Sequence, residues 1–158
     1  MSELGVRERT PRARPRIMGV LNVTPDSFSD GGLYSTTDQA VAHAQELVAQ
    51  GADLIDVGGE STRPNAARVS VEDELSRVIP VVRALAEQRI GVSVDTINST
   101  TARAAVEAGA EIINDVSGGL ADPEMYRAVA ETGVTYIAMH WRGHLDGTDD
   151  AQLSLIHI

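Results

Sequence analysis

Short apolar runs alternate along this chain with longer stretches in which apolar residues recur every three or four positions. The runs are four to seven residues long and contain few polar residues, which is typical of buried β-strands. We therefore expect five strands. They are Ile17–Val23, Leu54–Val57, Ile90–Val94, Ile112–Val116 and Val134–Met139.

The stretches that follow the first four runs have the periodicity of amphipathic helices. They are Asp38–Gln50, Val71–Gln88, Asn98–Ala108 and Asp122–Glu131. Gly51, Gly109 and Gly133 follow three of them, where a glycine commonly ends a helix. Asp122, followed by proline, is typical of a helix start, whereas Pro80 lies within the second stretch and predicts a kink or a break there.

The alternation of strand and helix predicts an α/β fold with a parallel sheet. Polar residues stand where the predicted strands end, at Asn22, Asp56, Asp95, Asn114 and His140. Because the carboxyl ends of parallel strands share one side of the sheet, we expect a ligand site there. Five βα units over residues 16–142 predict a partial TIM (β/α)8 barrel whose C-terminal units are missing, and a complete five-stranded open sheet is the alternative.

Composition narrows the class of protein. With 158 residues, of which 42% are apolar, the chain is long enough for one globular domain. It has no cysteine, which excludes disulfides and thiolate chemistry, and no lysine, which excludes a lysine nucleophile. No apolar run reaches the roughly 20 residues that span a bilayer, so we expect neither a membrane segment nor a secretion signal, and a cytoplasmic location.

Charge is distributed unevenly along the chain. The formal net charge is -10, yet residues 1–16 hold five arginines against two acidic residues. We expect residues 1–15 to be a flexible basic arm in front of an acidic body. An acidic body repels nucleic acid and anionic membranes, so neither is an expected partner.

The first predicted strand leads into a long polar segment, and together they read MGVLNVTPDSFSDGG. At the strand end, Asn22 can offer a neutral oxygen to a hard cation, and Asp30 can offer a carboxylate to a cation or to a developing positive charge. The alternative is a local turn in which both side chains bond nearby backbone amides. The length of the segment and its many functional groups favour a binding loop.

The segment after the second predicted strand reads DVGGESTRPN. Its glycines permit close backbone approach, Ser61 and Thr62 offer hydroxyls, and Arg63 can bind a phosphate through two parallel hydrogen bonds. This predicts an anion-binding loop that lacks the patterns of a dinucleotide site or a P-loop. Asp56 and Glu60 can form a catalytic pair, but we expect Asp56 to be buried and structural.

Two further polar residues close neighbouring predicted strands. Asp95 and Asn114 together can bind the donor and acceptor edge of a flat heterocycle such as a pterin or a purine, although capping of the next helix explains Asp95 alone equally well. We expect Asp115 to bond the backbone. His140 and His144 have the spacing of helical zinc ligands, but the intervening glycine and the missing glutamate argue against zinc.

Five segments in this order resemble dihydropteroate synthases, especially the actinobacterial forms, over about residues 16–142. They are MGVLNVTPDSFSDGG, DLIDVGGESTRPNA, VSVDT, EIINDVSGG and MHWR. The resemblance implies a (β/α)8 barrel that joins 6-hydroxymethyl-7,8-dihydropterin pyrophosphate to para-aminobenzoate with Mg²⁺, giving 7,8-dihydropteroate and pyrophosphate. It also implies a place in folate biosynthesis, inhibition by sulfonamides, and a homodimer for the full-length enzyme.

Residue roles follow from the same resemblance. Asn22 would bind the Mg²⁺–pyrophosphate. Asp30 would face the pterin cation formed as pyrophosphate leaves, and Arg63 would stabilise the leaving anion, so these two are the expected catalytic residues. The expected substrate-binding residues are Ser61, Thr62, Asp95, Asn114, and, around the aminobenzoate, Phe28 and Pro64.

The chain also departs from the family. Family members continue through three more strands that supply an aspartate, a lysine, an arginine and a histidine, and residues 143–158 do not resemble them. We therefore expect a truncated or aberrant end and no activity of this chain alone. Two alternatives are a pterin-binding methyltransferase domain, which the segment TPDSFSDGG disfavours, and a pterin-binding paralogue without turnover, which the retained candidate site residues disfavour.

Overall fold

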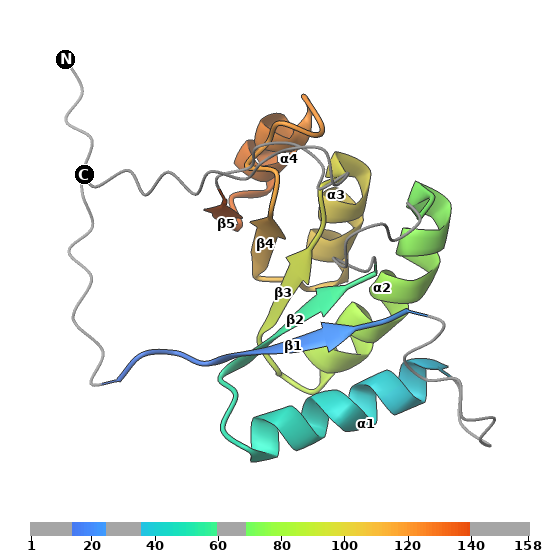
Figure 1. The fold of residues 1–158 in the computed structure, drawn as a ribbon, viewed down its shortest axis with the longest axis vertical. Helices are drawn as coiled ribbons and strands as arrows, with labels where there is room; N and C mark the ends of the chain where they lie inside the picture. The colour runs from blue at the N-terminus through green and yellow to red at the C-terminus, as the bar shows by residue number, and fades with distance from the viewer. Residues whose placement is uncertain (1–13, 25–35, 60–68, 140–158) are drawn as a thin grey trace, which may run out of the picture.

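A computed structural model describes residues 14–24, 36–59 and 69–139, and in these ranges strands and helices alternate along the chain (Figure 1). The elements are β1 (Met18–Asn22), α1 (Thr36–Ala49), β2 (Leu54–Gly58), α2 (Val71–Glu87), β3 (Val92–Asp95), α3 (Ser99–Ala108), β4 (Ile112–Asp115), α4 (Met125–Thr132) and β5 (Thr135–Ala138). The five predicted strands are confirmed, each within two residues at either end.

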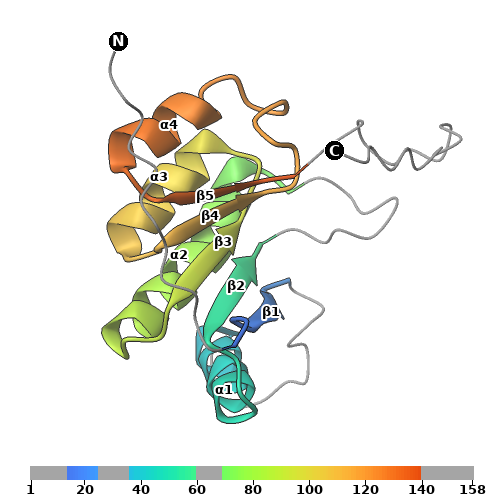
Figure 2. The same ribbon diagram turned by 90° about the vertical axis from the view of Figure 1, so that its left-hand side faces the viewer.

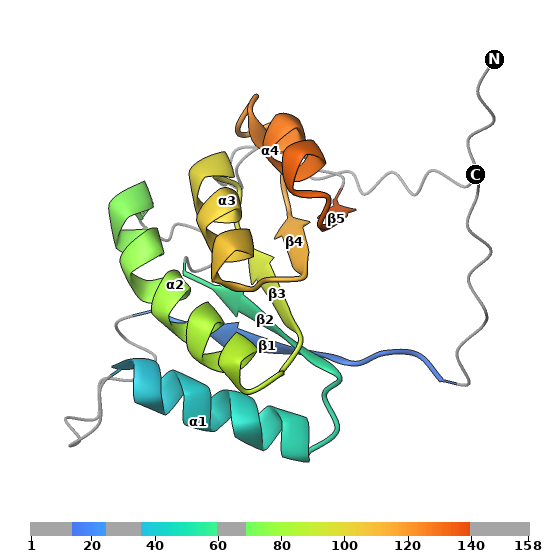
Figure 3. The same cartoon turned by 180° about the vertical axis from the view of Figure 1, so that it is seen from behind.

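The strands form one sheet in the order β1-β2-β3-β4-β5, and every neighbouring pair is parallel. The helices lie along one face of this sheet, as its profile and the view from behind show (Figures 2 and 3). A doubly wound open sheet would reverse its strand order and carry helices on both faces. Sequential order with helices on one face is the arrangement of a (β/α)8 barrel, so the prediction of five barrel units is confirmed and the open sheet is not.

The hydrophobic core lies between the sheet and the helices. Alternate strand residues point toward the helices because successive side chains of a strand point to opposite faces. These residues are fully or almost fully buried, as are the apolar residues of α2 that face them. They are Leu21, Ile55, Val57, Val92, Val94 and Ile113 from the strands, and Val78, Val81, Val82 and Leu85 from α2.

Helix α2 begins at a conventional cap and continues past its proline. The Ser70 hydroxyl accepts a hydrogen bond from the backbone N–H of Asp73 at 3.1 Å, which pairs one of the free donors of the first turn. Pro80 lies inside the helix, which runs unbroken from Val71 to Glu87, so the predicted break is wrong. The proline is exposed, as is Ser76, whose carbonyl loses its helical partner and can bond water instead.

Glycines end two of the helices as predicted. Gly109 and Gly133 follow α3 and α4 with φ of 113° and 67°, in the left-handed region that other residues disfavour. Helix α4 begins at Met125, not at Asp122, because Asp122 and Pro123 form a turn before it. No helix in the described ranges is long and apolar enough to cross a membrane.

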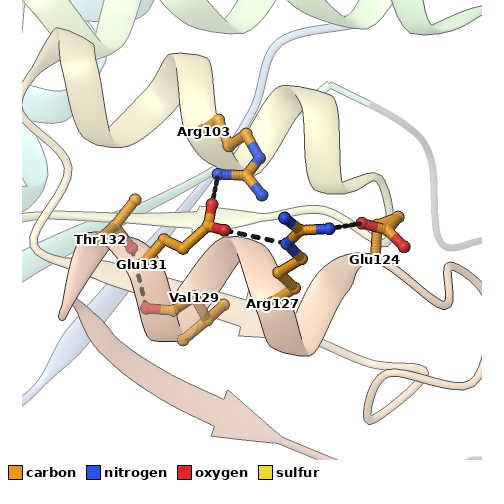
Figure 4. A network of polar contacts seen from close by, with 6 residues as sticks. All are labelled: Arg103, Glu124, Arg127, Val129, Glu131 and Thr132. Carbon is orange, nitrogen blue, oxygen red and sulfur yellow. Dashed lines mark hydrogen bonds and ion pairs between the residues drawn. The ribbon is translucent and has the colours of Figure 1, made fainter.

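A chain of ion pairs links the outer surfaces of α3 and α4 (Figure 4). Arg103 of α3 contacts Glu131 of α4 at 2.5 Å, and the second Glu131 oxygen accepts from Arg127 Nε at 2.9 Å. Arg127 also lies 3.8 Å from Glu124. These side chains are solvent-exposed or partly so, and exposed ion pairs of this kind each add little stability.

The segment before β1 is hydrogen-bonded to the sheet at the strands' amino ends, opposite the carboxyl ends. Arg14 forms two hydrogen bonds to the Asp53 carboxylate, at 2.8 and 2.9 Å, and the backbone N–H of Ile17 donates to the same carboxylate at 2.7 Å. The Arg14 guanidinium and the Ile17 amide hold the pKa of Asp53 below its usual range. Arg14 belongs to the predicted basic arm, whose residues 1–13 lie outside the described ranges.

Candidate functional site

Three of the candidate site residues lie in one row across the carboxyl ends of the strands. Asn22 of β1 is the register partner of Gly58 in β2, Gly58 of Asp95 in β3, and Asp95 of Asn114 in β4. Register partners in a parallel sheet point to the same face, and the buried residues before and after this row point to the helices. The row therefore faces away from the helices, toward what is the interior in a closed barrel.

Gly58 places no side chain between Asn22 and Asp95. A Cβ atom at Gly58 would lie 3.5 Å from the Asn22 side-chain oxygen and 3.8 Å from Asp95 Oδ2, both ordinary contact distances. The amide oxygen and the carboxylate thus lie on either side of this glycine. The arrangement suits a ligand that offers N–H donors, a cation, or both.

Asp56 lies one row deeper on the same face and contacts Asn114. The Asn114 amide nitrogen donates to Asp56 Oδ2 at 2.9 Å, which leaves the Asn114 carbonyl oxygen as an acceptor. Asp56 is 4% exposed, so the prediction that it is buried is confirmed. The other Asp56 oxygen and the hydroxyl of its register partner Ser93 are buried and have no hydrogen-bond partner among the described residues.

Ser93 was not among the sequence candidates, although a serine between two valines in a predicted strand marks a polar residue on the face opposite the core. Buried polar atoms are normally paired, and unpaired ones usually indicate a missing water, ion or ligand. The Asp56 and Ser93 oxygens thus continue the polar surface from Asp95 and Asn114 toward the middle of the strands.

The loop after β4 is built around Asp115. This fully buried carboxylate accepts from the backbone N–H groups of Ser117 and Gly119 at 2.8 Å each, and from the hydroxyls of Ser117 and Tyr136 at 2.7 Å each. The prediction that Asp115 bonds the backbone is confirmed. Burial and the Asp115 carboxylate raise the pKa of Tyr136 above its ordinary value, because both disfavour the phenolate.

Close packing fixes the two glycines of this loop. Gly118 and Gly119 have φ of 59° and 82°, and a Cβ on Gly118 would overlap the Met139 carbonyl oxygen. The Tyr126 hydroxyl also donates to the Gly118 carbonyl. The loop after β4 thus packs against the end of β5, where the Met139 N–H also donates to the Asp115 carbonyl.

The remaining candidates lie outside the described residues. Phe28 and Asp30 fall in the segment 25–35, and the second loop with Ser61, Thr62, Arg63 and Pro64 falls in 60–68. His140 and His144 also lie outside. The structure therefore positions Asn22, Asp95 and Asn114 together and leaves the other predicted residues untested.

The described residues could hold a magnesium ion only together with a substrate phosphate and water. They contain no group of three or more His, Asp or Glu side chains that could hold a metal. Magnesium, however, is commonly bound by one or two protein oxygens together with substrate phosphates and water. The Asn22 side-chain oxygen beside Gly58 is a metal ligand of the required type.

Comparison with known proteins identifies the class to which this site belongs. Sequential βα units with a polar row at the strands' carboxyl ends define an α/β barrel protein with a small-molecule site. Residues 18–154 match the family described as pterin binding enzyme. The chain belongs to this family.

Relatives within the family carry a more specific name. Dihydropteroate synthase of Mycobacterium leprae is 58% identical over 127 residues, which are 80% of this chain and 45% of the relative. That of Streptococcus pyogenes is 54% identical over 78% of this chain and 47% of the relative. The chain thus spans about half the length of the curated relatives it matches.

Solved structures agree with the sequence comparison. Xanthomonas albilineans dihydropteroate synthase with 4-aminobenzoic acid superposes with a TM-score of 0.78 at 52% identity, covering 85% of this chain and 50% of the other. The same enzyme with 7,8-dihydropteroate gives 0.73 at 49% identity, covering 82% and 47%. Both likenesses cover more than four fifths of this chain and support the assignment to a partial barrel.

Proposed function

We propose that this chain supplies the N-terminal half of a dihydropteroate synthase site, which couples 6-hydroxymethyl-7,8-dihydropterin pyrophosphate to para-aminobenzoate. The observation that carries the proposal is the row of Asn22, Asp95 and Asn114, in which Gly58 places no side chain between Asn22 and Asp95. The names of the relatives and the bound molecules of the solved synthases support it.

The pterin is the substrate that this row would bind. A pterin ring presents adjacent N–H donors and a carbonyl acceptor along one edge, and a carboxylate can accept two parallel donors. Asp95 would take the donors of that edge, and Asn114, whose amide nitrogen is committed to Asp56, would offer its carbonyl oxygen to a further donor. The Asp56 and Ser93 oxygens, which have no partner within the described ranges, lie on the same face and keep the surroundings polar.

The residues of the two loops would carry the chemistry. Asp30 would stabilise the pterin cation that develops as the bond to pyrophosphate breaks, and Arg63 would stabilise the leaving anion. The uncharged aniline nitrogen of para-aminobenzoate then attacks the exocyclic carbon and loses a proton. Ser61 and Thr62 would bind the pyrophosphate, and Phe28 and Pro64 the aminobenzoate; Mg²⁺ held near Asn22 would neutralise part of the pyrophosphate charge.

Binding by the chain itself is the first test. Isothermal titration calorimetry with the pterin pyrophosphate and Mg²⁺ should give measurable affinity, and Asp95→Asn should weaken it about tenfold or more, since a charge-assisted hydrogen bond is lost. Glu107→Gln is the matched control, because it removes one exposed carboxylate from α3 outside the row. Equal affinity of Asp95→Asn and the wild type would remove Asp95 from the site.

Coupling requires a longer protein, because the chain spans only about half of its relatives. A chimera that joins this chain after Met139 to the C-terminal half of the Mycobacterium leprae relative should release pyrophosphate only when both substrates are present. Asp30→Ala in that chimera should slow coupling more than it weakens pterin binding. A chimera that binds both substrates without turnover would favour the paralogue that binds pterin without catalysis.

A further inference from the structure

Glu74, in the first turn of α2, is a buried carboxylate to which the proposed chemistry gives no role. It is 2% exposed, and in the part of the chain that the structure describes its side chain accepts from two neutral donors at the start of α3. The Asn98 amide nitrogen donates to Glu74 Oε2 at 2.8 Å, and the Thr101 hydroxyl donates to the same oxygen at 2.6 Å. Burying a carboxylate costs free energy that an apolar side chain would not, so its contribution must come from these directed bonds.

The Asn98 side chain donates to Glu74 and does not cap its own helix. Asn98 is the N-cap residue of α3, with φ of -107° and ψ of 120°, yet its side chain makes no capping hydrogen bond. The first helical N–H, that of Ser99, is capped instead by Asp122 Oδ2 from the loop after β4, at 2.7 Å. The Asp95–Asn98 turn is therefore held from both sides, by Glu74 through Asn98 and by Asp122 through Ser99.

Glu74 also packs against the end of β2. A Cβ atom at Gly59 would lie 3.0 Å from Glu74 Cγ and 2.7 Å from Val78 Cγ2, so the first turns of α2 rest directly on this backbone. The preceding residue, Gly58, is the register partner of Asp95. Glu74 thus contacts the end of one strand while it bonds to the turn that follows the next.

We propose that Glu74 is a positioning residue that holds the Asp95 turn against the end of β2, so that the Asp95 carboxylate keeps its place in the row beside Gly58. The proposal rests on the proposed function, in which Asp95 binds the pterin. Glu74 itself touches no substrate. It acts through Asn98, three residues after Asp95, and through its packing on Gly59.

Three variants test the proposal on the full 158-residue chain. Glu74→Leu removes both hydrogen bonds at similar volume and should weaken pterin pyrophosphate binding about tenfold, whereas Glu74→Gln keeps an acceptor oxygen and should stay within about threefold. Glu72→Leu, an exposed change in the same helical turn, is the matched control and should bind like the wild type. If Glu74→Leu does not fold, Asn98→Ala removes the link without altering α2 and should have the same effect.

A readout that needs no ligand separates this proposal from the proposed function. In ¹⁵N NMR spectra, Glu74→Leu should shift the backbone amides of Asp95 and Thr96 and the side-chain amide of Asn98, while Glu72→Leu should not. If the wild type binds no pterin pyrophosphate, the proposed function fails for this chain, and these shifts alone decide the role of Glu74.

Three results would overturn the positioning role. One is a folded Glu74→Leu variant with wild-type affinity. Another is a Glu74→Gln variant as weak as Glu74→Leu, since the hydrogen bonds would then not be the cause. The third is a variant that loses stability while the Asp95 and Thr96 amides keep their wild-type shifts, which would make Glu74 a purely structural residue.

Discussion

Replacing Tyr136 by phenylalanine should change how the stability of this protein depends on alkaline pH. The Tyr136 hydroxyl donates to the buried Asp115 carboxylate at 2.7 Å, and burial together with that carboxylate raises the pKa of Tyr136. The folded protein therefore holds this proton more tightly than the unfolded chain does. The resulting stability is fully present below the ordinary tyrosine pKa of about 10 and is lost as pH rises toward the raised value.

The magnitude follows from linkage and from the hydrogen bond itself. Near neutral pH, Tyr136→Phe should lower the free energy of unfolding by about 1–2 kcal/mol, because one charge-assisted bond is lost and the three other donors to Asp115 remain. Above about pH 10 the wild type should lose up to about 1.4 kcal/mol per pH unit that Tyr136→Phe does not lose. The gap between the two proteins should therefore narrow.

Urea unfolding followed by circular dichroism at about pH 7, 9, 10 and 11 measures this gap directly. The chain suits the experiment because it has no lysine and no cysteine, so tyrosine is its only residue type whose ordinary side-chain pKa lies between about 8 and 11. Tyrosinate absorbance of the wild type minus that of Tyr136→Phe reports the titration of Tyr136 alone. A constant difference in unfolding free energy from neutral to alkaline pH would refute the reasoning.

Three further changes probe the scaffold around the site. Gly59→Ala should cost about 1–3 kcal/mol, measured by urea unfolding, because its Cβ would press on Val78 and Glu74. Gly91→Ala controls for simple loss of a glycine, because its φ is not positive and its Cβ would meet no atom closer than 3.5 Å. Asp122→Ala should cost about 1 kcal/mol through the lost cap. Burial alone would raise the pKa of Asp122, but hydrogen bonds from Ser99 and Glu124 hold this pKa below its usual range. The stability that Asp122 contributes should therefore fade as pH falls below about 4, and unfolding of the variant should lack this pH dependence. Glu131→Gln should lower the thermal midpoint at low salt and have a smaller effect at high salt, and an equal effect at both would contradict the screened network of Figure 4.

Much of the fold was predictable because its signals are local. Each strand is a short apolar run, and Gly109 and Gly133 stand at the helix ends that they define. Asn22, Asp95 and Asn114 could be grouped in advance, since strand ends of a parallel sheet share one side. What the pattern could not supply was the register that brings Asp95 and Asn114 into one row with Gly58 between Asp95 and Asn22.

The wrong prediction at Pro80 and the missed residue Glu74 each have a physical cause. Pro80 does not break α2, because the proline and the carbonyl it deprives lie on the solvent side, where water replaces the lost partner. Glu74 looks like its exposed neighbours Glu72 and Asp73, and its burial depends on Asn98 and Thr101, which lie in another unit. Sequence periodicity cannot distinguish these three acids, since the difference is made by tertiary contacts.

The sequential strand order has a consequence for synthesis on the ribosome. Each strand pairs with the strand that emerges just before it, so no strand in the described sheet must wait for a distant partner. Each new strand finds an edge already formed by its predecessor, and the helix between them covers the joint as it emerges. The sheet can thus form strand by strand during translation. Until the next strand emerges, the last strand exposes unpaired backbone N–H and C=O groups that can pair with another chain.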